Sequence, residues 1–403
     1  MTMPAVVESF WPGIWLTGAL VCAVLLFYTF VGYPVLVTLI ARYRHKPLNG
    51  QPGWQPRVAV VIVMHNEAAR VRSKLATLLD QDYPCDHVRI VVVSDGSTDG
   101  TVRCVQEFAA ANPTMAVTIV DKTERRGKAA CLNDAVATGD EPVVVFTDAR
   151  QMLNLQAVSA LVDTLSDPAV AVVSGELEFR REGMQSFGDG VDAYWRYEKM
   201  IRKAEARLHS VPGATGALYA MRRAAFRPID PHTILDDVAI PMQACLLGGR
   251  VVFDPRALAY DDAAQAPAQE RARKVRTLAG NFQLLALMPQ LCVPWRNPIF
   301  WQYLSHKVLR LLAPWAMLGL LLFSLLLAPS HPVAQVVFGL QLLFYVTALG
   351  ALQFNVLSRW KPLRVAAAFV ALNAFAVLGL WAWLMQQDLH RWKRAQPAGT
   401  RST

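Results

Sequence analysis

The sequence predicts an α/β domain with an open, largely parallel sheet, joined to helices that span a membrane. Between Pro47 and about Gly280, short apolar runs rich in β-branched residues alternate with stretches of helical periodicity. Long segments without charged residues flank this region. The 403-residue chain is 54% hydrophobic and only 18% charged, which is too apolar for one soluble globule. We therefore expect one folded domain and one membrane-embedded part.

Continuous apolar runs are the predicted strands of the sheet. Such runs are typical of strands that are buried on both faces of a parallel sheet. Between them, apolar residues recur at helical spacing over residues 71–78 and again over 102–109. The predicted strands are Val58–Met64, Val88–Ser94, Val117–Val120, Val143–Thr147 and Val170–Ser174. Because ligands of open α/β sheets bind beyond the carboxyl ends of the strands, the polar residues there are the candidates for function.

Uncharged segments predict four membrane spans. Ser9–Ala41 contains no Asp, Glu, Lys or Arg, and about 20 residues suffice for one helical span. The uncharged stretch Leu311–Ser358 is broken at Pro329-Ser330-His331-Pro332, which predicts a helical hairpin with helices near 311–328 and 333–356. Val365–Gln387 is the fourth uncharged stretch.

Basic residues give the expected topology. Arg42, Arg44 and Lys46 follow the first span directly, so the positive-inside rule places the α/β domain in the cytoplasm. Four spans return the C-terminus to the outside, whereas its basic tail favours the inside, so the number of spans and the side of the C-terminus stay open. We expect a first span with its basic flank at 1–46, the α/β domain at 47–280, interfacial helices at 281–307, about three further spans at 308–390, and a basic tail at 391–403.

The net charge of +9 arises from 40 Lys and Arg against 31 Asp and Glu. Such a balance fits nucleic acid, an anionic membrane surface or an anionic substrate. Because long uncharged segments are present, we expect a lipid bilayer as the partner and no nucleic acid. The six cysteines are scattered without a CxxC pair and are typical of reduced residues.

Acidic residues stand at the ends of several predicted strands. Asn66 and Glu67 follow the first strand, Asp95 follows the second, and Asp148 follows the fourth. Carboxylates at neighbouring strand ends repel each other unless a cation or a hydrogen-bonding ligand lies between them. A metal or a nucleotide is therefore implied. Helix capping is the simpler explanation for residues 97–99.

A basic run from Lys122 to Lys128 follows the third strand and opens a helix at Lys128. Cations beside a helix N-terminus suit a diphosphate, and a solvated basic loop is the alternative. A phosphate-binding P-loop is excluded, because Ala129 stands where that motif has Ser or Thr.

Two adjacent carboxylates, Asp236 and Asp237, precede another predicted helix. A helix cap accounts for one of them, most naturally Asp236. The other is available for chemistry, because a carboxylate within hydrogen-bond reach of a hydroxyl can take its proton.

These motifs together resemble the family 2 inverting glycosyltransferases, in their membrane-embedded branch of cellulose, chitin, hyaluronan and bacterial poly-N-acetylglucosamine synthases. The resemblance covers about Pro56 to Gly280 and the flanking helices. It implies a GT-A-like (Rossmann-like) fold and a hexosyl- or N-acetylhexosaminyltransferase that uses a UDP-sugar. A polyprenyl-phosphate sugar transferase is the alternative enzyme. A membrane scaffold that binds nucleotide without catalysis is the alternative outside the enzymes. The motifs are His65-Asn66-Glu67, Asp95-Gly96-Ser97, Gly127-Lys128-Ala129, Thr147-Asp148-Ala149 and Asp236-Asp237.

The resemblance also implies roles for individual residues. Asn66, Glu67 and Asp95 would hold the uracil and ribose, and Lys128 would lie near the nucleotide. Asp148, as the first member of the family's Asp-x-Asp motif, would bind Mg²⁺ or Mn²⁺. Asp237 would be the general base.

Two departures from the family pattern affect these roles. Arg150 replaces the second Asp of Asp-x-Asp, so the metal loses a ligand and the arginine can contact phosphate directly. The segment Glu270–Lys274 lacks the Trp of the processive members' Gln-x-x-Arg-Trp motif, so processive synthesis and single addition both stay open. Arg273 and Arg276 can face the diphosphate or form a basic surface next to anionic lipid.

The expected acceptor side combines Asp236, a helix and a glycine-rich turn. Tyr194 and Trp195 could stack on a sugar, although the helix that carries them also fits an ordinary amphipathic helix. Gly213, Thr215 and Gly216 could line the acceptor site, although a tight turn before the strand from Ala217 explains them as well. The expected acceptor is a saccharide or a lipid-linked glycan, with export or synthase subunits as further partners. The expected location is the inner (plasma) membrane, with multiple spans.

Overall fold

The computed structural model describes residues 5–180, 188–262, 267–358, 360–385 and 389. Two compact units make up the chain. The helical unit comprises Met1–His45, Glu182–Leu208 and Trp301–Trp381, and the α/β unit comprises Lys46–Arg181, His209–Phe300 and Ala382–Thr403.

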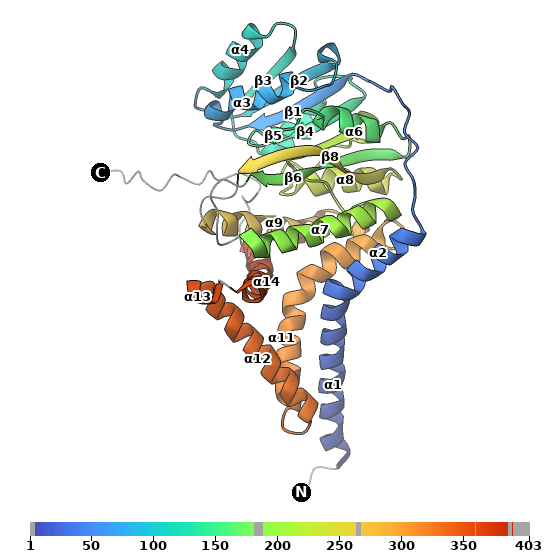
Figure 1. Ribbon diagram of the computed structural model, residues 1–403, viewed down its shortest axis with the longest axis vertical. Helices are drawn as coiled ribbons and strands as arrows, with labels where there is room; N and C mark the ends of the chain where they lie inside the picture. Colours follow the sequence, from blue (N-terminus) through green and yellow to red (C-terminus); the bar gives the residue numbers. More distant parts are fainter. Residues whose placement is uncertain (1–4, 181–187, 263–266, 359, 386–388, 390–403) are drawn as a thin grey trace, which may run out of the picture. The chain divides into compact units, whose positions relative to one another are not determined.

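The α/β unit is built on one eight-stranded sheet in the order β3-β2-β1-β4-β7-β6-β8-β5 (Figure 1). Neighbouring strands from β3 to β4 run parallel, β7 pairs antiparallel with β4 and β6, and β6 pairs parallel with β8. The predicted open α/β sheet is therefore confirmed. The strands are β1 Val58–Met64, β2 Val88–Asp95, β3 Ala116–Lys122, β4 Val143–Thr147, β5 Met152–Leu153, β6 Val170–Arg180, β7 Leu218–Arg222 and β8 Arg250–Asp262.

Helices of this unit connect the strands. α3 buries the predicted face of Val71, Leu75 and Leu78. The helices are α3 Ala68–Leu79, α4 Thr101–Ala111, α5 Lys128–Val136, α6 Ala157–Leu165, α8 Asp236–Leu246 and α9 Pro267–Leu287, with 3₁₀ turns at Cys85–His87, Arg223–Ala225 and Pro289–Cys292.

The strands differ in how completely they are buried. All residues of β1 and β4 are buried, as the continuous apolar runs predict. The prediction of burial on both faces is wrong for Val117–Val120, because these residues of β3 are only half-buried. β3 is the edge of the sheet and has β2 as its single neighbouring strand.

Four helices among the described residues are long and apolar enough to cross a membrane, which agrees with the predicted number of spans. They cover Pro12–Tyr43, Phe300–Leu327, Pro332–Gln353 and Lys361–Met385. The helical unit contains α1 Ala5–Phe27, the π-helical turn Tyr28–Gly32, α2 Tyr33–Tyr43, α7 Gly188–Leu208, α10 Phe300–Tyr303, the π-helical turn Leu304–Val308, α11 Leu309–Leu327, α12 Pro332–Gln353, α13 Asn355–Ser358 and α14 Lys361–Met385.

The second of these helices begins at Phe300, earlier than the predicted start near residue 311. The predicted start was placed after Arg310, because this charged residue precedes the uncharged run. The Arg310 side chain is, however, paired within the helical unit. Arg310 contacts Glu198 of α7, and His306 Nε2 lies 2.9 Å from the same carboxylate. Paired charges can remain inside a helical bundle, so the helix continues through them.

The helix predicted around residues 194–208 is confirmed as α7. Its apolar residues Ile201 and Ala204 pack in one buried cluster with Tyr33 and Val37 of α2. The Tyr33 hydroxyl donates a hydrogen bond to Glu205 of α7. The amphipathic-helix interpretation therefore accounts for this face of α7.

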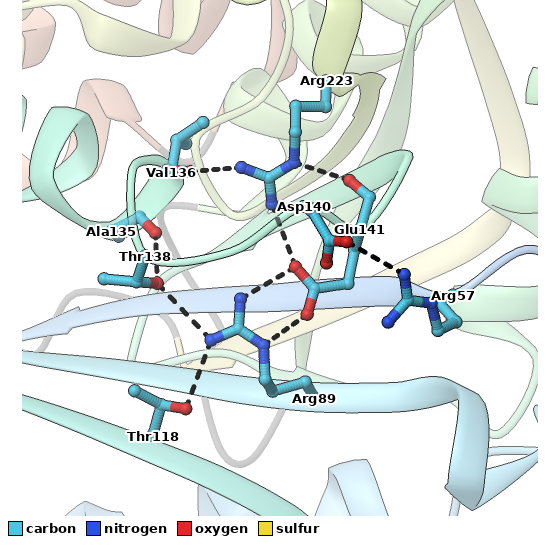
Figure 2. Close-up of polar contacts among 9 residues, drawn as sticks. All are labelled: Arg57, Arg89, Thr118, Ala135, Val136, Thr138, Asp140, Glu141 and Arg223. Carbon is cyan, nitrogen blue, oxygen red and sulfur yellow. Dashed lines mark hydrogen bonds and ion pairs between the residues drawn. The ribbon is translucent and has the colours of Figure 1, made fainter.

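A buried ion-pair cluster joins β2 to the loop before β4 (Figure 2). Arg89 Nη2 donates to Glu141 Oε2 at 2.8 Å, and Arg223 Nη2 contacts the same oxygen at 3.1 Å. The hydrogen bond from Arg89, helped by the charges of both arginines, lowers the pKa of Glu141 to about 2. Figure 2 also shows a second pair, between Arg57 and Asp140, which is exposed to solvent.

We expect Glu141→Gln to lower the free energy of unfolding at pH 7 by about 3 kcal/mol. Because the pKa of Glu141 is lower in the folded than in the unfolded state, its contribution is present above about pH 4.5 and disappears as the pH falls towards 2. Thermal unfolding of the purified protein between pH 7 and pH 3 measures this, and the difference between parent and variant should shrink with acid. Asp140→Asn is the matched control, and a loss as large as that of Glu141→Gln would contradict the assignment.

Candidate active site

The loop after β1 is fastened to the loop after β2. Asn66 has a positive φ of 56°, and its side-chain oxygen accepts hydrogen bonds from the amides of Thr98 at 2.7 Å and Asp99 at 3.3 Å. The Glu67 amide donates to Thr101 Oγ1 at 2.8 Å. Asn66 and Glu67, both predicted to bind the donor, therefore lie beside the carboxyl end of β2.

Asp99 binds the first amides of α4 and α3, although the N-cap residues of these helices are Gly100 and Glu67 and the predicted cap is therefore displaced by one residue in α4. Its carboxylate accepts hydrogen bonds from the amides of Thr101 at 2.9 Å and Ala68 at 3.2 Å. Glu67 forms an ion pair with Arg70 at 2.6 Å. The polar residues of both loops thus have structural partners as well as a place at the sheet edge.

Asp95, at the end of β2, holds the basic run in place. Its buried carboxylate accepts hydrogen bonds from the amides of Arg126 at 2.6 Å and Gly127 at 3.0 Å. Gly96 has a φ of +64°, and a side chain there would come within 2.8 Å of the Arg125 nitrogen. The turn after β2 and the basic run therefore pack too closely for any residue but glycine at position 96.

Lys128 lies between two carboxylates from different elements. As predicted, it opens α5. Its Nζ atom is 2.8 Å from Asp148 Oδ1 and 3.1 Å from Asp236 Oδ2. Burial alone would lower the pKa of Lys128, but the charges of Asp148 and Asp236 outweigh it and raise the pKa. The Lys128 ammonium therefore stays protonated at neutral pH and links the ends of β4 and α8.

Asp236 is not the cap of α8, so that prediction is wrong. The residue before the helix is Leu235, which makes no side-chain capping hydrogen bond, and Asp236 is the first helical residue. Its buried carboxylate faces Lys128 instead. The carboxylate still lies at the positive end of the helix dipole, where a negative charge is stabilised.

Asp237 lies against the glycine-rich turn that precedes β7. Its Oδ2 atom accepts a hydrogen bond from the Gly216 amide at 3.0 Å, and its main-chain oxygen accepts one from Ala214 at 2.8 Å. The Thr215 amide donates to Ser174 Oγ at 3.0 Å, and Gly213 begins the turn. The structure thus brings the predicted base together with the predicted acceptor-side turn from Gly213 to Gly216, and Asp237 is partly exposed.

The carboxylates around Lys128 fit a cation that is shared with phosphate oxygens. Asp236 Oδ2 is buried, and its ion pair with the Lys128 ammonium at 3.1 Å falls short of hydrogen-bond geometry. No group of three or more His, Cys, Asp or Glu among the described residues is arranged as a complete metal cage. Mg²⁺ commonly binds one or two carboxylates together with substrate phosphates and water, so Asp148 and Asp236 are a sufficient protein contribution.

Arg150 is held by a carboxylate that sequence analysis did not identify. Its Nη2 atom lies 2.7 Å from Oδ2 of Asp261, at the end of β8, and Gln151 Nε2 donates to the same oxygen at 3.0 Å. The sequence does carry a signal for this strand end, because the acidic pair Asp261-Asp262 directly follows an apolar run. Arg150 therefore contacts Asp261 in this structure.

The two arginines of α9 have different surroundings. Burial lowers the pKa of Arg276, while the charges of Asp236, Asp237 and Asp148 oppose that effect, so its guanidinium lies within the electrostatic reach of these carboxylates. Arg273 pairs with Glu270 at 2.5 Å. Of the two predicted donor residues, Arg276 is the one that the site carboxylates influence.

Tyr194 and Trp195 belong to α7 of the helical unit. The side chain of Tyr194 lies outside the described residues, and Trp195 is partly buried. An acceptor-side role for this pair stays a prediction.

Two buried residues next to the site were not identified from the sequence. Lys74 of α3 is fully buried and donates hydrogen bonds to Thr147 and Gln151 on either side of Asp148. Burial lowers the pKa of Lys74 to about 7, although the charge of Asp148 acts in the opposite direction. Tyr219 of β7 is also fully buried, and burial together with the nearby carboxylates raises its pKa.

Comparison with known proteins identifies the domain. Residues 59–229 match the family model described as Glycosyl transferase family 2. The chain is 21% identical over 226 residues to a poly-beta-1,6-N-acetyl-D-glucosamine synthase of Staphylococcus epidermidis, covering 55% of this chain and 52% of that protein. It is 29% identical over 143 residues to glycosyltransferase AglE of Haloferax volcanii, covering 36% and 44%. The chain thus spans about half the length of these curated relatives.

A solved structure extends the similarity to most of the chain. The mannosyltransferase PcManGT from Pyrobaculum calidifontis, in complex with GDP-Man and Mn²⁺, has a TM-score of 0.69 and 25% sequence identity. The match covers 91% of this chain and 98% of that one. The resemblance drawn from the sequence motifs is therefore confirmed at the level of family and fold. The chain therefore has a GT-A-like open sheet and carries a glycosyltransferase family 2 domain over residues 59–229.

Proposed function

We propose that this protein is a membrane-bound inverting glycosyltransferase that moves a sugar from a UDP donor to a saccharide or lipid-linked glycan, for a cell-surface polysaccharide. The observation that carries the proposal is the grouping of Asp148, Asp236 and Lys128 beside the partly exposed Asp237. The first three residues can stabilise a charged leaving group, and Asp237 is a separate carboxylate for the acceptor. The similarity to a poly-beta-1,6-N-acetyl-D-glucosamine synthase supports a sugar acceptor.

The donor would lie along the carboxyl ends of β1, β2 and β4. Asn66, Glu67 and Asp95 would hold the nucleoside, because they and their loops form this edge of the sheet. Lys128 would contact the diphosphate, since its ammonium is already directed to this edge by Asp148. Arg276 would add positive charge next to the same carboxylates.

A divalent metal ion would be bound by Asp148, with Asp236 nearby. Mg²⁺ or Mn²⁺ bound there would offset the charge that develops on the leaving diphosphate. Mn²⁺ in the PcManGT complex with GDP-Man supports this cofactor. Arg150 would reach the phosphate only after releasing Asp261, with which it pairs at 2.7 Å.

Asp237 would remove the proton from the attacking hydroxyl. The hydrogen bond from the Gly216 amide holds the carboxylate at the glycine-rich turn, on the predicted acceptor side of the site. Attack on the side of the anomeric carbon opposite the diphosphate would invert its configuration. The turn from Gly213 to Gly216 would form the acceptor side of the site.

The membrane would hold the enzyme by its four apolar helices. We propose the inner (plasma) membrane, with the domain at 47–280 on the cytoplasmic side, because Arg42, Arg44 and Lys46 follow the first helix. The remaining parts would be the first span at 1–46, an interfacial segment that starts at 281, further spans up to 390 and the basic tail. The predicted boundary at 307 is too late, because the second apolar helix already begins at Phe300.

One experiment tests donor, acceptor and orientation together. Membrane vesicles that contain the protein are incubated with UDP-glucose, UDP-N-acetylglucosamine, UDP-galactose or GDP-mannose, and release of the nucleoside diphosphate is measured with and without saccharide acceptors. We expect UDP release in inverted vesicles but not in right-side-out vesicles, because nucleotide sugars do not cross the bilayer. GDP-mannose is the second candidate donor, since PcManGT binds it.

Other outcomes would change the proposal. Release from GDP-mannose alone would replace the UDP donor, and transfer only to polyprenyl phosphate would favour the alternative acceptor. Reaction in right-side-out vesicles would reverse the orientation. No release from any donor by the solubilised protein would contradict the proposed reaction.

A further inference from the structure

Lys74 is a buried lysine directly behind the turn that carries Asp148. Its side chain has no exposed surface. The Nζ atom donates hydrogen bonds to Thr147 Oγ1 at 2.7 Å and to the main-chain oxygen of Gln151 at 2.6 Å. These two acceptors stand immediately before and after Asp148, Ala149 and Arg150 in the sequence. One side-chain nitrogen therefore joins both ends of the turn.

Both ends of the turn are also tied to neighbouring strands. The Thr147 hydroxyl accepts from Lys74 and donates to the Ala217 oxygen at 2.8 Å, which fixes the direction of both hydrogen bonds. The Gln151 side chain donates to Asp261 of β8 at 3.0 Å. Lys74 is the group that these two anchors share.

Packing alone does not explain a lysine at this position. Val71, Leu75 and Leu78 already form the apolar face of α3, and an aliphatic residue would fill the same space without the cost of burying a polar amine. The lysine thus stands where its hydrogen bonds define the geometry of a carboxylate-bearing turn.

We propose that Lys74 is a positioning residue, which holds the Thr147–Gln151 turn so that the Asp148 carboxylate is placed for the cation and the donor diphosphate. The inference rests on the proposed function of Asp148. Lys74 contacts Thr147 and Gln151 and acts on Asp148 through the turn. Groups that orient a metal-binding carboxylate typically affect metal affinity or activity by about 10 to 100-fold.

The test compares Lys74→Met with Arg72→Met in the full-length protein in lipid. Methionine has a similar length but no charge, and Arg72 is an exposed residue of the same helix that pairs with Glu107. Mn²⁺ binding in the presence of UDP is measured by electron paramagnetic resonance, together with the melting temperature and UDP release. We expect Lys74→Met to weaken Mn²⁺ binding by about 10-fold or more and Arg72→Met to leave it unchanged.

A merely structural Lys74 would give another pattern. The folded fraction of Lys74→Met would then bind Mn²⁺ with parental affinity despite a lower melting temperature, and this result would overturn the inference. If Lys74→Met does not fold, Thr147→Val decides, because it removes one acceptor of Lys74; parental Mn²⁺ affinity in that variant would also overturn it. Failure of the parent protein to release UDP or to bind Mn²⁺ would instead contradict the proposed function.

Discussion

Asp237→Asn is expected to lower turnover by about 10² to 10⁴-fold while the protein still folds and binds UDP. Asparagine keeps the shape of the side chain and an oxygen that can accept the hydrogen bond from the Gly216 amide, which now reaches Asp237 Oδ2 at 3.0 Å. Its amide group cannot take the proton of an attacking hydroxyl. Turnover with saturating donor and acceptor, and UDP affinity by calorimetry, measure the two effects separately.

Two further substitutions serve as comparisons. Asp140→Asn removes an exposed carboxylate that pairs with Arg57, and we expect parental turnover. Asp236→Asn removes a partner of Lys128, so we expect weaker donor binding and a smaller loss of turnover than for Asp237→Asn. If Asp237→Asn keeps more than about a tenth of parental turnover, the base assignment fails. A polyprenyl-phosphate acceptor would then become the better explanation, because its phosphate oxygen attacks without a base.

Sequence patterns predicted the centre of the sheet accurately. Val58–Met64 and Val143–Thr147 coincide with β1 and β4, because strands buried on both faces need unbroken apolar runs. The same pattern could not show that Val117–Val120 would lie at an edge. Position in a sheet depends on pairing between strands that are distant in sequence, and periodicity carries no information on pairing.

β8 illustrates a second limit of sequence patterns. Residues Arg250–Asp262 form the longest strand of the described sheet, but Asp254, Pro255 and Arg256 interrupt its apolar run. Its charged residues have tertiary partners, such as Thr164 of α6, whose hydroxyl donates a hydrogen bond to Asp254 Oδ2 at 2.6 Å. Those contacts exist only in the folded chain.

The site was predicted residue by residue, but its connections were not. The motifs identified Asp148, Lys128 and Asp236 separately, and the structure shows the lysine between the two carboxylates. The capping role of Asp236 was wrong because the helix begins one residue earlier than a cap at that position requires, and sequence patterns locate helix ends only within one or two residues. Lys74 was missed because a lysine within a helix is normally solvated.

Asp148→Ala is expected to lower glycosyl transfer by at least about 100-fold, since charge neutralisation at a leaving diphosphate contributes several kcal/mol. EDTA should have a similar effect on the parent protein, and added MnCl₂ or MgCl₂ should restore its activity. Both Asp148→Ala and Asp148→Asn remove the carboxylate that pairs with Lys128 at 2.8 Å. Asp148→Asn is the companion variant, because its amide oxygen can still accept a hydrogen bond from Lys128. The melting temperature and UDP affinity without metal show whether either variant remains folded.

The combination of variant and chelator tests whether Asp148 acts through a metal. If it does, EDTA removes from the parent the same contribution that the substitution removes, so EDTA should lower the activity of Asp148→Ala little further. If EDTA lowers the activity of Asp148→Ala by the same factor as it lowers that of the parent, the carboxylate and the metal act independently. Full parental activity in EDTA would mean that Lys128 and Arg150 neutralise the diphosphate alone. Arg150 would then have to leave Asp261, its partner at 2.7 Å, so Arg150→Met should become as damaging as Asp148→Ala in that case.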